Sequence, residues 1–147
     1  MDPFSVLSIK IEKGMNRIVI KYTIDMTTYV KKLSEPWFTY TETSVKTVEG
    51  RLNKEDWIHM NVDDIIQFTN KERGVEKKFS VKIVKICHYD TFRLYLEEAG
   101  LKNCLPGVDT IEQGLDIYYK IYSIEDEMKY KVKAFHLQTI EMVRENP

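Results

Sequence analysis

The chain has 147 residues, of which 43% are hydrophobic, 12% aromatic and 31% charged, with a formal net charge of -1 at pH 7. This composition supports one packed domain over residues 1–147, and its near-neutral charge excludes nucleic-acid binding through bulk positive charge. No apolar run approaches the roughly 20 residues of a membrane span, and the charged opening segment is not a signal peptide. We therefore expect an intracellular protein, cytoplasmic or nuclear, without a membrane partner.

The opening segment alternates polar and apolar residues on both sides of a turn at Gly14, which predicts a β-hairpin. We treat residues 1–30 as an N-terminal hairpin extension and residues 33–140 as the core of the domain. After the extension, Ser34 is a typical N-cap and predicts a short helix that ends near Thr43. The side chains expected to be buried by this helix are Trp37 and Tyr40, with Phe38 as a further candidate.

Three strands are predicted next, over residues 46–52, 64–69 and 77–88. The last of them becomes apolar on both faces, which is typical of a strand in a closed or covered sheet. The stretch from Lys71 to Lys85 holds six basic residues against two acidic ones. We interpret it as a solvated hairpin rim that discourages edge pairing, with a positive binding edge as the alternative.

Three helices and a strand close the chain. Asp90 is expected to cap a helix that stops at Gly100, the capping-box sequence at 109–112 starts a second helix, and Ser123 starts a shorter third one. Residues 132–140 form the last predicted strand. Strands on both sides of a helical group predict an α+β fold with a mostly antiparallel sheet curled toward a barrel.

Most enzyme and metal motifs are missing from the sequence. The histidines and cysteines have no zinc-site spacing, so we expect no metal, and without a glycine-rich phosphate loop or nucleophile elbow we expect no cofactor. Cys87 and Cys104 have no activating neighbours and are expected to be reduced, partly buried thiols. His136, on the last strand, is expected to be a satisfied wall residue.

Charged side chains gather at a predicted helix–strand junction. Lys46, Glu49 and Arg51 fall within six residues, and the last two share one face of the strand. Such a group can hold a phosphate or carboxylate through its cations, while the glutamate orients them or accepts a hydrogen bond from a base amino group. From the spacing alone, a solvated cluster of surface charges is the simpler interpretation.

The segments LSEPWF at 33–38 and SVKTVEGR at 44–51 resemble the hallmark of the ASCH family, part of the PUA-like superfamily. That hallmark is a hydrophobic helix followed by G-x-K-x-x-E-x-R. Lys46, Glu49 and Arg51 match its charged positions, whereas Ser44 replaces its first glycine. The resemblance therefore assigns the same three side chains to a family motif.

Further segments extend the resemblance over most of the chain. VDDIIQF at 62–68 is similar to the family strand G-D-x-I-x-F, with Asp63 in place of its glycine. The segments LPGV at 105–108, YKIYS at 119–123 and AFHL at 134–137 resemble a subgroup of the family found in large DNA viruses and some microbes. Because glycine permits backbone conformations that other residues avoid, the two replacements predict a loop shape different from the family's usual one.

The resemblance implies a small PUA-like β-barrel with surrounding helices and a cleft whose lip carries the three charged residues. Family members are linked to RNA or DNA binding, so the leading hypothesis is a nucleic-acid-binding module, with RNA as the expected ligand and single-stranded forms included. Aromatic side chains would offer stacking faces for bases. The candidate nucleic-acid-binding residues are Lys46, Glu49, Arg51, Ser44, Trp37, Tyr40, Tyr119 and Lys120.

Two alternatives stay open. One family branch resembles an amidohydrolase acting on N4-acetylcytidine, but its nucleophilic threonine is replaced here by Glu49. A small hydrolase acting on such a modified nucleoside, or on RNA, would use Lys46 and Glu49 as its candidate catalytic residues. The other alternative is a protein-interaction module, with the N-terminal hairpin as its best candidate surface. The sequence does not indicate an oligomeric state.

Overall fold

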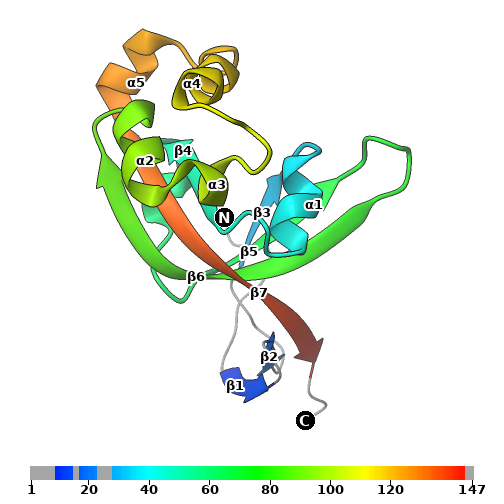
Figure 1. Cartoon of the computed structure of the whole chain (residues 1–147). Coiled ribbons are helices and arrows are strands. Elements are labelled where there is room, and N and C mark those ends of the chain that lie inside the picture. The colour runs from blue at the N-terminus through cyan, green and yellow to red at the C-terminus, as the bar shows by residue number, and fades with distance from the viewer. Residues whose placement is uncertain (1–8, 15–16, 23–27, 145–147) are drawn as a thin grey trace. The chain divides into compact units, whose positions relative to one another are not determined.

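The structure, a computed structural model, describes residues 9–14, 17–22 and 28–144. Its strands are β1 (Ile9–Gly14), β2 (Arg17–Tyr22), β3 (Tyr29–Lys32), β4 (Val48–Leu52), β5 (Ile65–Asn70), β6 (Lys77–Tyr89) and β7 (Val132–Arg144) (Figure 1). Its helices are α1 (Trp37–Glu42), the 3-10 helix η1 (Glu55–His59), α2 (Phe92–Ala99), α3 (Leu101–Cys104), α4 (Ile111–Tyr119) and α5 (Ile124–Tyr130). The predicted α+β class is confirmed.

The chain divides into two compact units. Unit 1 consists of residues 1–44, 63–83 and 138–147, and unit 2 consists of residues 45–62 and 84–137. The long strands β6 and β7 contribute residues to both units. The described strands are hydrogen-bonded in the order β1-β2-β7-β6-β5-β3, and β4 pairs with β7 beside that path.

Unit 1 combines antiparallel and parallel pairs. β1 and β2 form the predicted antiparallel hairpin, β5 pairs antiparallel with β6, and the pairs β2–β7 and β3–β5 are parallel. Apolar alternation does not reveal strand direction, which is why the sequence did not predict the parallel pairs. On α1, Phe38 is fully buried and its ring meets that of Phe79 edge to face at 4.8 Å.

Unit 2 contains the α-helices α2 to α5, the 3-10 helix η1 and the short strand β4. β4 pairs antiparallel with the first residues of β7, in a register that places Gly50 opposite Ala134. Side-chain oxygens of Thr91, Thr110 and Ser123 cap α2, α4 and α5. The aromatic core between α2 and α4 includes Phe92 and Tyr118, whose rings stack at 4.3 Å. Each cap satisfies a backbone N–H that a helix start leaves without a partner.

Some sequence predictions are wrong in detail. Thr91, not Asp90, caps α2. α1 starts at Trp37 and buries Phe38 and Thr41, whereas Trp37 and Tyr40 are only half-buried. β3, η1 and α3 were not predicted, because each is too short to show a period. β7 extends beyond the predicted end at residue 140.

The hairpin joining β5 and β6 is exposed throughout residues 71–78. This exposure fits the predicted solvated rim and equally the alternative of a positive binding edge. Within the part of the chain that the structure describes, no helix combines the length and apolar character needed to cross a membrane.

Candidate functional site

The motif glutamate lies between two cations. β4 projects Glu49 and Arg51 from the same face, because side chains two residues apart on a strand point the same way. One carboxylate oxygen of Glu49, Oε2, accepts hydrogen bonds from Arg51 Nε at 3.0 Å and Nη2 at 2.9 Å. Its other oxygen, Oε1, lies 3.3 Å from Lys46 Nζ. The three predicted side chains therefore converge.

Lys46 lies deeper than the sequence predicted. Its side chain is 2% exposed, and its Nζ donates hydrogen bonds to the carbonyl oxygens of Val48 and Cys104. The sequence predicted that Lys46 lies at the lip of a cleft, but its side chain is buried. Three acceptors surround the ammonium group, so Lys46 holds Glu49 and ties the end of α3 to β4. A solvated surface cluster, the simpler interpretation of the spacing, is excluded for this lysine.

The electrostatics of the cluster favour the charged forms of Glu49 and Arg51. Burial raises the pKa of Glu49, but the neighbouring Arg51 and Lys46 outweigh it, so the pKa lies below the ordinary value. Burial lowers the pKa of Arg51, while Glu49 raises it above its usual range. A carboxylate that is buried, ionised and bonded to two cations is a fixed anchor and a weak base.

Arg51 reaches from this anchor into a pocket. Its guanidinium lies over the ring of Trp57, with its central carbon 4.7 Å from the ring centroid, and its side chain is 23% exposed. Such an arrangement is a cation–π contact. The pocket measures about 240 Å³ and is lined by Arg51, Leu52, Lys54, Glu55, Trp57, Ile121, Tyr122 and Asp126. The guanidinium of Arg51 is thus held in place by Glu49 and Trp57 and is accessible from the pocket.

Sequence reasoning missed two aromatic side chains that line this pocket, Trp57 and Tyr122. Trp57 is buried beneath Arg51, and its backbone carbonyl accepts a hydrogen bond of 2.8 Å from the buried Lys133. Tyr122 stacks on Phe92 at 5.4 Å and lines the pocket together with Arg51. Burial raises the pKa of Tyr122, with Arg51 opposing. No local pattern links these residues to Arg51, although Trp57 follows it by only six positions.

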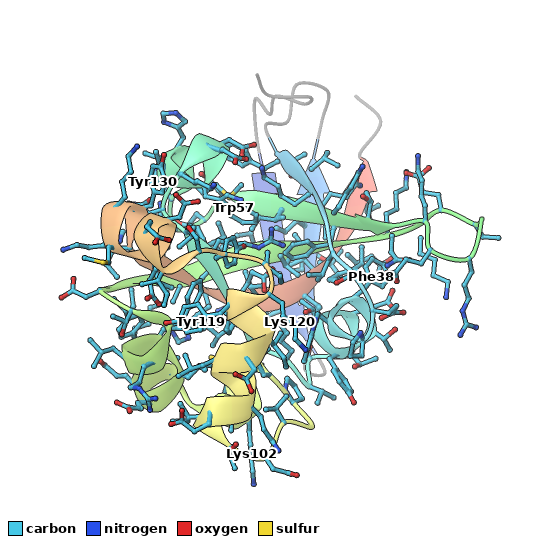
Figure 2. The ribbon with its side chains drawn as sticks, turned by 90° about the horizontal axis from the view of Figure 1, so that it is seen from above. Phe38, Trp57, Lys102, Tyr119, Lys120 and Tyr130 are labelled. Carbon is cyan, nitrogen blue, oxygen red and sulfur yellow. The ribbon has the colours of Figure 1, made fainter. Side chains whose placement is uncertain are left out.

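Two other residues that were predicted to bind nucleic acid, Tyr119 and Lys120, lie at the end of α4 in unit 2 (Figure 2). The Tyr119 hydroxyl donates to the buried carboxylate of Glu127 at 2.9 Å, and burial together with this bond raises its pKa to about 12. That carboxylate also accepts the backbone N–H of Phe92 at 2.8 Å. Tyr119 therefore stabilises the start of α2 through Glu127. Lys120 is exposed and, like Tyr119, does not line the Arg51 pocket.

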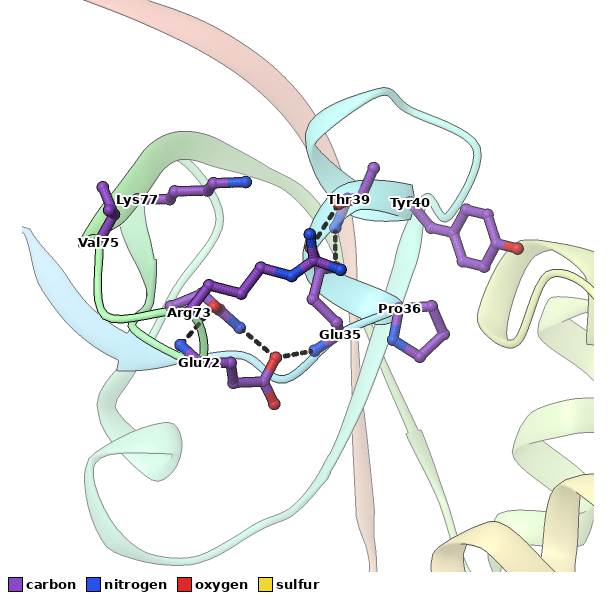
Figure 3. Close-up of a pocket in the computed structure, with 9 residues that line it drawn as sticks. Glu35, Pro36, Thr39, Tyr40, Glu72, Arg73, Val75 and Lys77 are labelled. Atoms are coloured by element: carbon purple, nitrogen blue, oxygen red, sulfur yellow. Dashed lines mark hydrogen bonds between the residues drawn. The ribbon is translucent and has the colours of Figure 1, made fainter.

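The predicted residues Trp37, Tyr40 and Ser44 belong to unit 1. The rings of Trp37 and Tyr40 lie 6.3 Å apart on α1, and Ser44 Oγ is 3.1 Å from Thr139 Oγ1. Tyr40 lines a separate cavity of about 670 Å³ beside the β5–β6 hairpin (Figure 3). Arg73 of that hairpin lines the same cavity. The carboxylates bordering it are bonded internally, as Thr39 donates to Glu35 and the Glu35 N–H donates to Glu72.

Histidine and cysteine do not form a metal centre. Among the described residues, no group of three or more His, Cys, Asp or Glu side chains is arranged to hold an ion. Nε2 of His136 is buried and, within the same residues, makes no hydrogen bond, which departs from the expected satisfied wall residue. Burial, followed by the nearby Lys85, lowers the pKa of His136. The neutral imidazole is therefore favoured.

The α+β fold of this chain is PUA-like. The chain belongs to the ASCH domain family, whose model matches residues 32–142. The crystal structure of a hypothetical protein, PH0355, superposes with a TM-score of 0.69 at 34% identity, covering 78% of this chain and 100% of that one. The solution structure of protein PF0455 from Pyrococcus furiosus gives 0.64 at 34% identity, covering 77% and 97%. No curated protein matches the sequence.

The two positions where the family hallmark has glycine keep a glycine-like backbone. Ser44 has φ of 64° and Asp63 has φ of 77°, both in the left-handed region. The replacing residues therefore adopt a backbone conformation that glycine tolerates more easily than they do. A side chain in this region costs of order 1–2 kcal/mol, less for Asp, whose short polar side chain tolerates it. Asp63 also pairs with Lys82 at 3.1 Å.

Proposed function

We propose that this protein binds RNA, and that the pocket beside Arg51 holds one unstacked base. The observation that carries the proposal is the oriented guanidinium, fixed by Glu49 and Trp57 and exposed toward the pocket. Membership of a PUA-like family generally associated with RNA supports the ligand class. DNA is the alternative ligand, and Glu49 and Lys46 act as positioning residues.

The charges around the pocket favour a base over a bare phosphate. Two cations, Arg51 and Lys54, are matched by two carboxylates, Glu55 and Asp126. A phosphate would approach both carboxylates, whereas the edge of a base offers donors to the acids and acceptors to the arginine. The pocket is also smaller than the roughly 300–1,000 Å³ of drug-sized sites, which suits a single base.

Replacing Arg51 with lysine is expected to weaken RNA binding about tenfold or more, because a bidentate arginine contact contributes roughly 1–3 kcal/mol and lysine lacks the planar fork. The probe is a labelled single-stranded RNA of mixed sequence, titrated at several salt concentrations beside DNA of the same sequence. For the wild type, two or three phosphate contacts along the strand give a log–log salt slope of about -2. Tyr122→Phe is expected to weaken binding less.

The matched control is Arg93→Lys. Arg93 is an exposed arginine of α2, and its guanidinium is hydrogen-bonded to Glu112 at 3.0 Å. Its replacement should leave the affinity unchanged, and thermal unfolding shows whether each variant is folded. Absence of wild-type binding at low salt would overturn the proposal. Equal losses in both arginine variants would show that the loss is not specific to the Arg51 pocket.

The hydrolase alternative predicts turnover of N4-acylcytidines or RNA that depends on Glu49. The lowered pKa of Glu49 and its bonds to Arg51 and Lys46 oppose a role as general base, which needs a pKa near the working pH. We expect no product when purified protein is incubated with these substrates. Turnover that disappears in Glu49→Gln, with the variant still folded, would establish the enzyme instead.

Other details stay predictions. A protein partner for the N-terminal hairpin and the similarity to a viral subgroup receive no support from the named structural neighbours, one of which is archaeal. Location in the cytoplasm or nucleus, and the boundary between a hairpin extension and a core, likewise stay predictions.

A further inference from the structure

Large apolar side chains are strongly exposed around α5 of unit 2. Ile121, just after α4, is 68% exposed, and Ile124 and Met128 on α5 are 58% and 74% exposed. Ile124 and Met128 are four positions apart and share one helix face. Single exposed apolar residues are ordinary, but three gathered on one short stretch form an unpartnered apolar surface.

The charges of α5 are arranged with opposite signs at its two ends. Glu125 and Asp126 lie in the first turn, and Lys129 lies in the last turn. Glu125 and Lys129 are exposed. By helical spacing, both lie on the same side of the apolar pair Ile124 and Met128. In an antiparallel pair of such helices, the acidic end of each meets the basic end of the other. This is the self-complementarity that a two-fold symmetric interface requires.

We propose that the α5 surface, formed by Ile121, Ile124, Glu125, Met128 and Lys129, binds a second copy of this chain about a two-fold axis. Nucleic acid is a poorer occupant, because the exposed carboxylate of Glu125 repels phosphate. An unrelated protein would not need the antisymmetric charges. The apolar surface is small compared with stable interfaces, so the dimer is weak and forms reversibly.

The interface would adjoin the pocket described above. Ile121 lines the same pocket as Arg51, and so does Asp126 of α5. A second copy seated on α5 therefore narrows the approach to that pocket and places two pockets near one symmetry axis. This consequence depends on the proposed function, whereas the association itself does not.

The experiment is sedimentation equilibrium of the full chain without RNA, from about 10 µM to 1 mM, the range in which a weak interface populates both states. We expect monomer at the low end and dimer at the high end. Met128→Ser should weaken association at least tenfold. Leu94→Ser, which removes a 46% exposed apolar side chain of α2, is the matched control and should change nothing.

A charge exchange tests the antiparallel arrangement itself. Glu125→Lys and Lys129→Glu should each weaken the dimer, because like charges then face each other, and the combination of both should restore it. A monomer at every concentration would overturn the proposal. So would dimerisation that Met128→Ser leaves intact, or a monomer whose RNA affinity falls in Met128→Ser, which would assign the surface to RNA.

Discussion

Glu49→Gln is expected to lower the free energy of unfolding by about 3 kcal/mol or more at pH 7, because removing one member of a buried ion cluster leaves an uncompensated charge. Glutamine has the same shape but no charge, while Lys46 and Arg51 stay in place. The ammonium of Lys46, with its side chain 2% exposed, then retains only carbonyl acceptors. Urea titration followed by tryptophan fluorescence measures the loss.

The size of this loss depends on pH in a defined direction. The pKa of Glu49 is lowered in the folded state, so its contribution is complete above the ordinary carboxyl pKa of about 4.3 and disappears as pH falls through the folded-state value. Protonated Glu49 resembles glutamine. The stability curves of wild type and variant should therefore lie apart at pH 7 and approach each other below about pH 4.

Glu55→Gln provides the control for this prediction. Glu55 is exposed and lies 4.0 Å from Lys54, a surface pair that contributes less than about 1 kcal/mol. Its replacement should change stability by no more than about 0.5 kcal/mol at any pH. A Glu49→Gln variant that behaves like this control, or a loss that stays constant down to pH 3, would contradict the buried-anchor interpretation.

The parts of the fold that were predictable are those set by local sequence signals, such as helix caps. Ser123 caps α5 because its short hydroxyl side chain satisfies a first N–H group, and the sequence predicted this cap directly. The capping box at 109–112 marked the start of α4, but the cap is Thr110, one position later than the pattern implied. Strand direction and the order of pairing depend on contacts distant in sequence. The parallel pair of β3 and β5 therefore had no local signal.

The sequence predicted which charged residues come together at the site, but not how deeply they are buried. The spacing of Glu49 and Arg51 on one strand face fixes their contact, whatever surrounds them. Whether the group lies at the surface depends on what covers it. Lys46 is buried because the carbonyl of Cys104, far along the chain, accepts its hydrogen bond. Tyr122 enters the pocket for the same long-range reason, whereas the hydroxyl of Tyr119 is bonded to Glu127 instead.

Gly50→Ala is expected to destabilise the protein by about 3 kcal/mol, at the upper end of the cost of overpacking a filled core. Gly50 stands between Glu49 and Arg51 on β4. A Cβ atom added there would lie 2.5–2.8 Å from ring atoms and the hydroxyl of Tyr95, which is itself fully buried. The backbone of Gly50 is not in the left-handed region, so the cost comes from this contact alone.

Gly14→Ala is the matched control, since a Cβ at that position would meet nothing within 4 Å. A double variant, Gly50→Ala with Tyr95→Leu, separates crowding from other effects. Tyr95→Leu alone leaves a cavity, but in the double variant the smaller side chain makes room for the new methyl group. The double variant should therefore lose at least about 1 kcal/mol less than the sum of the single losses. Additive losses would show that β4 accommodates a side chain at position 50 without crowding Tyr95. The close packing of Tyr95 against Gly50 would then not be what fixes the strand that carries Glu49 and Arg51.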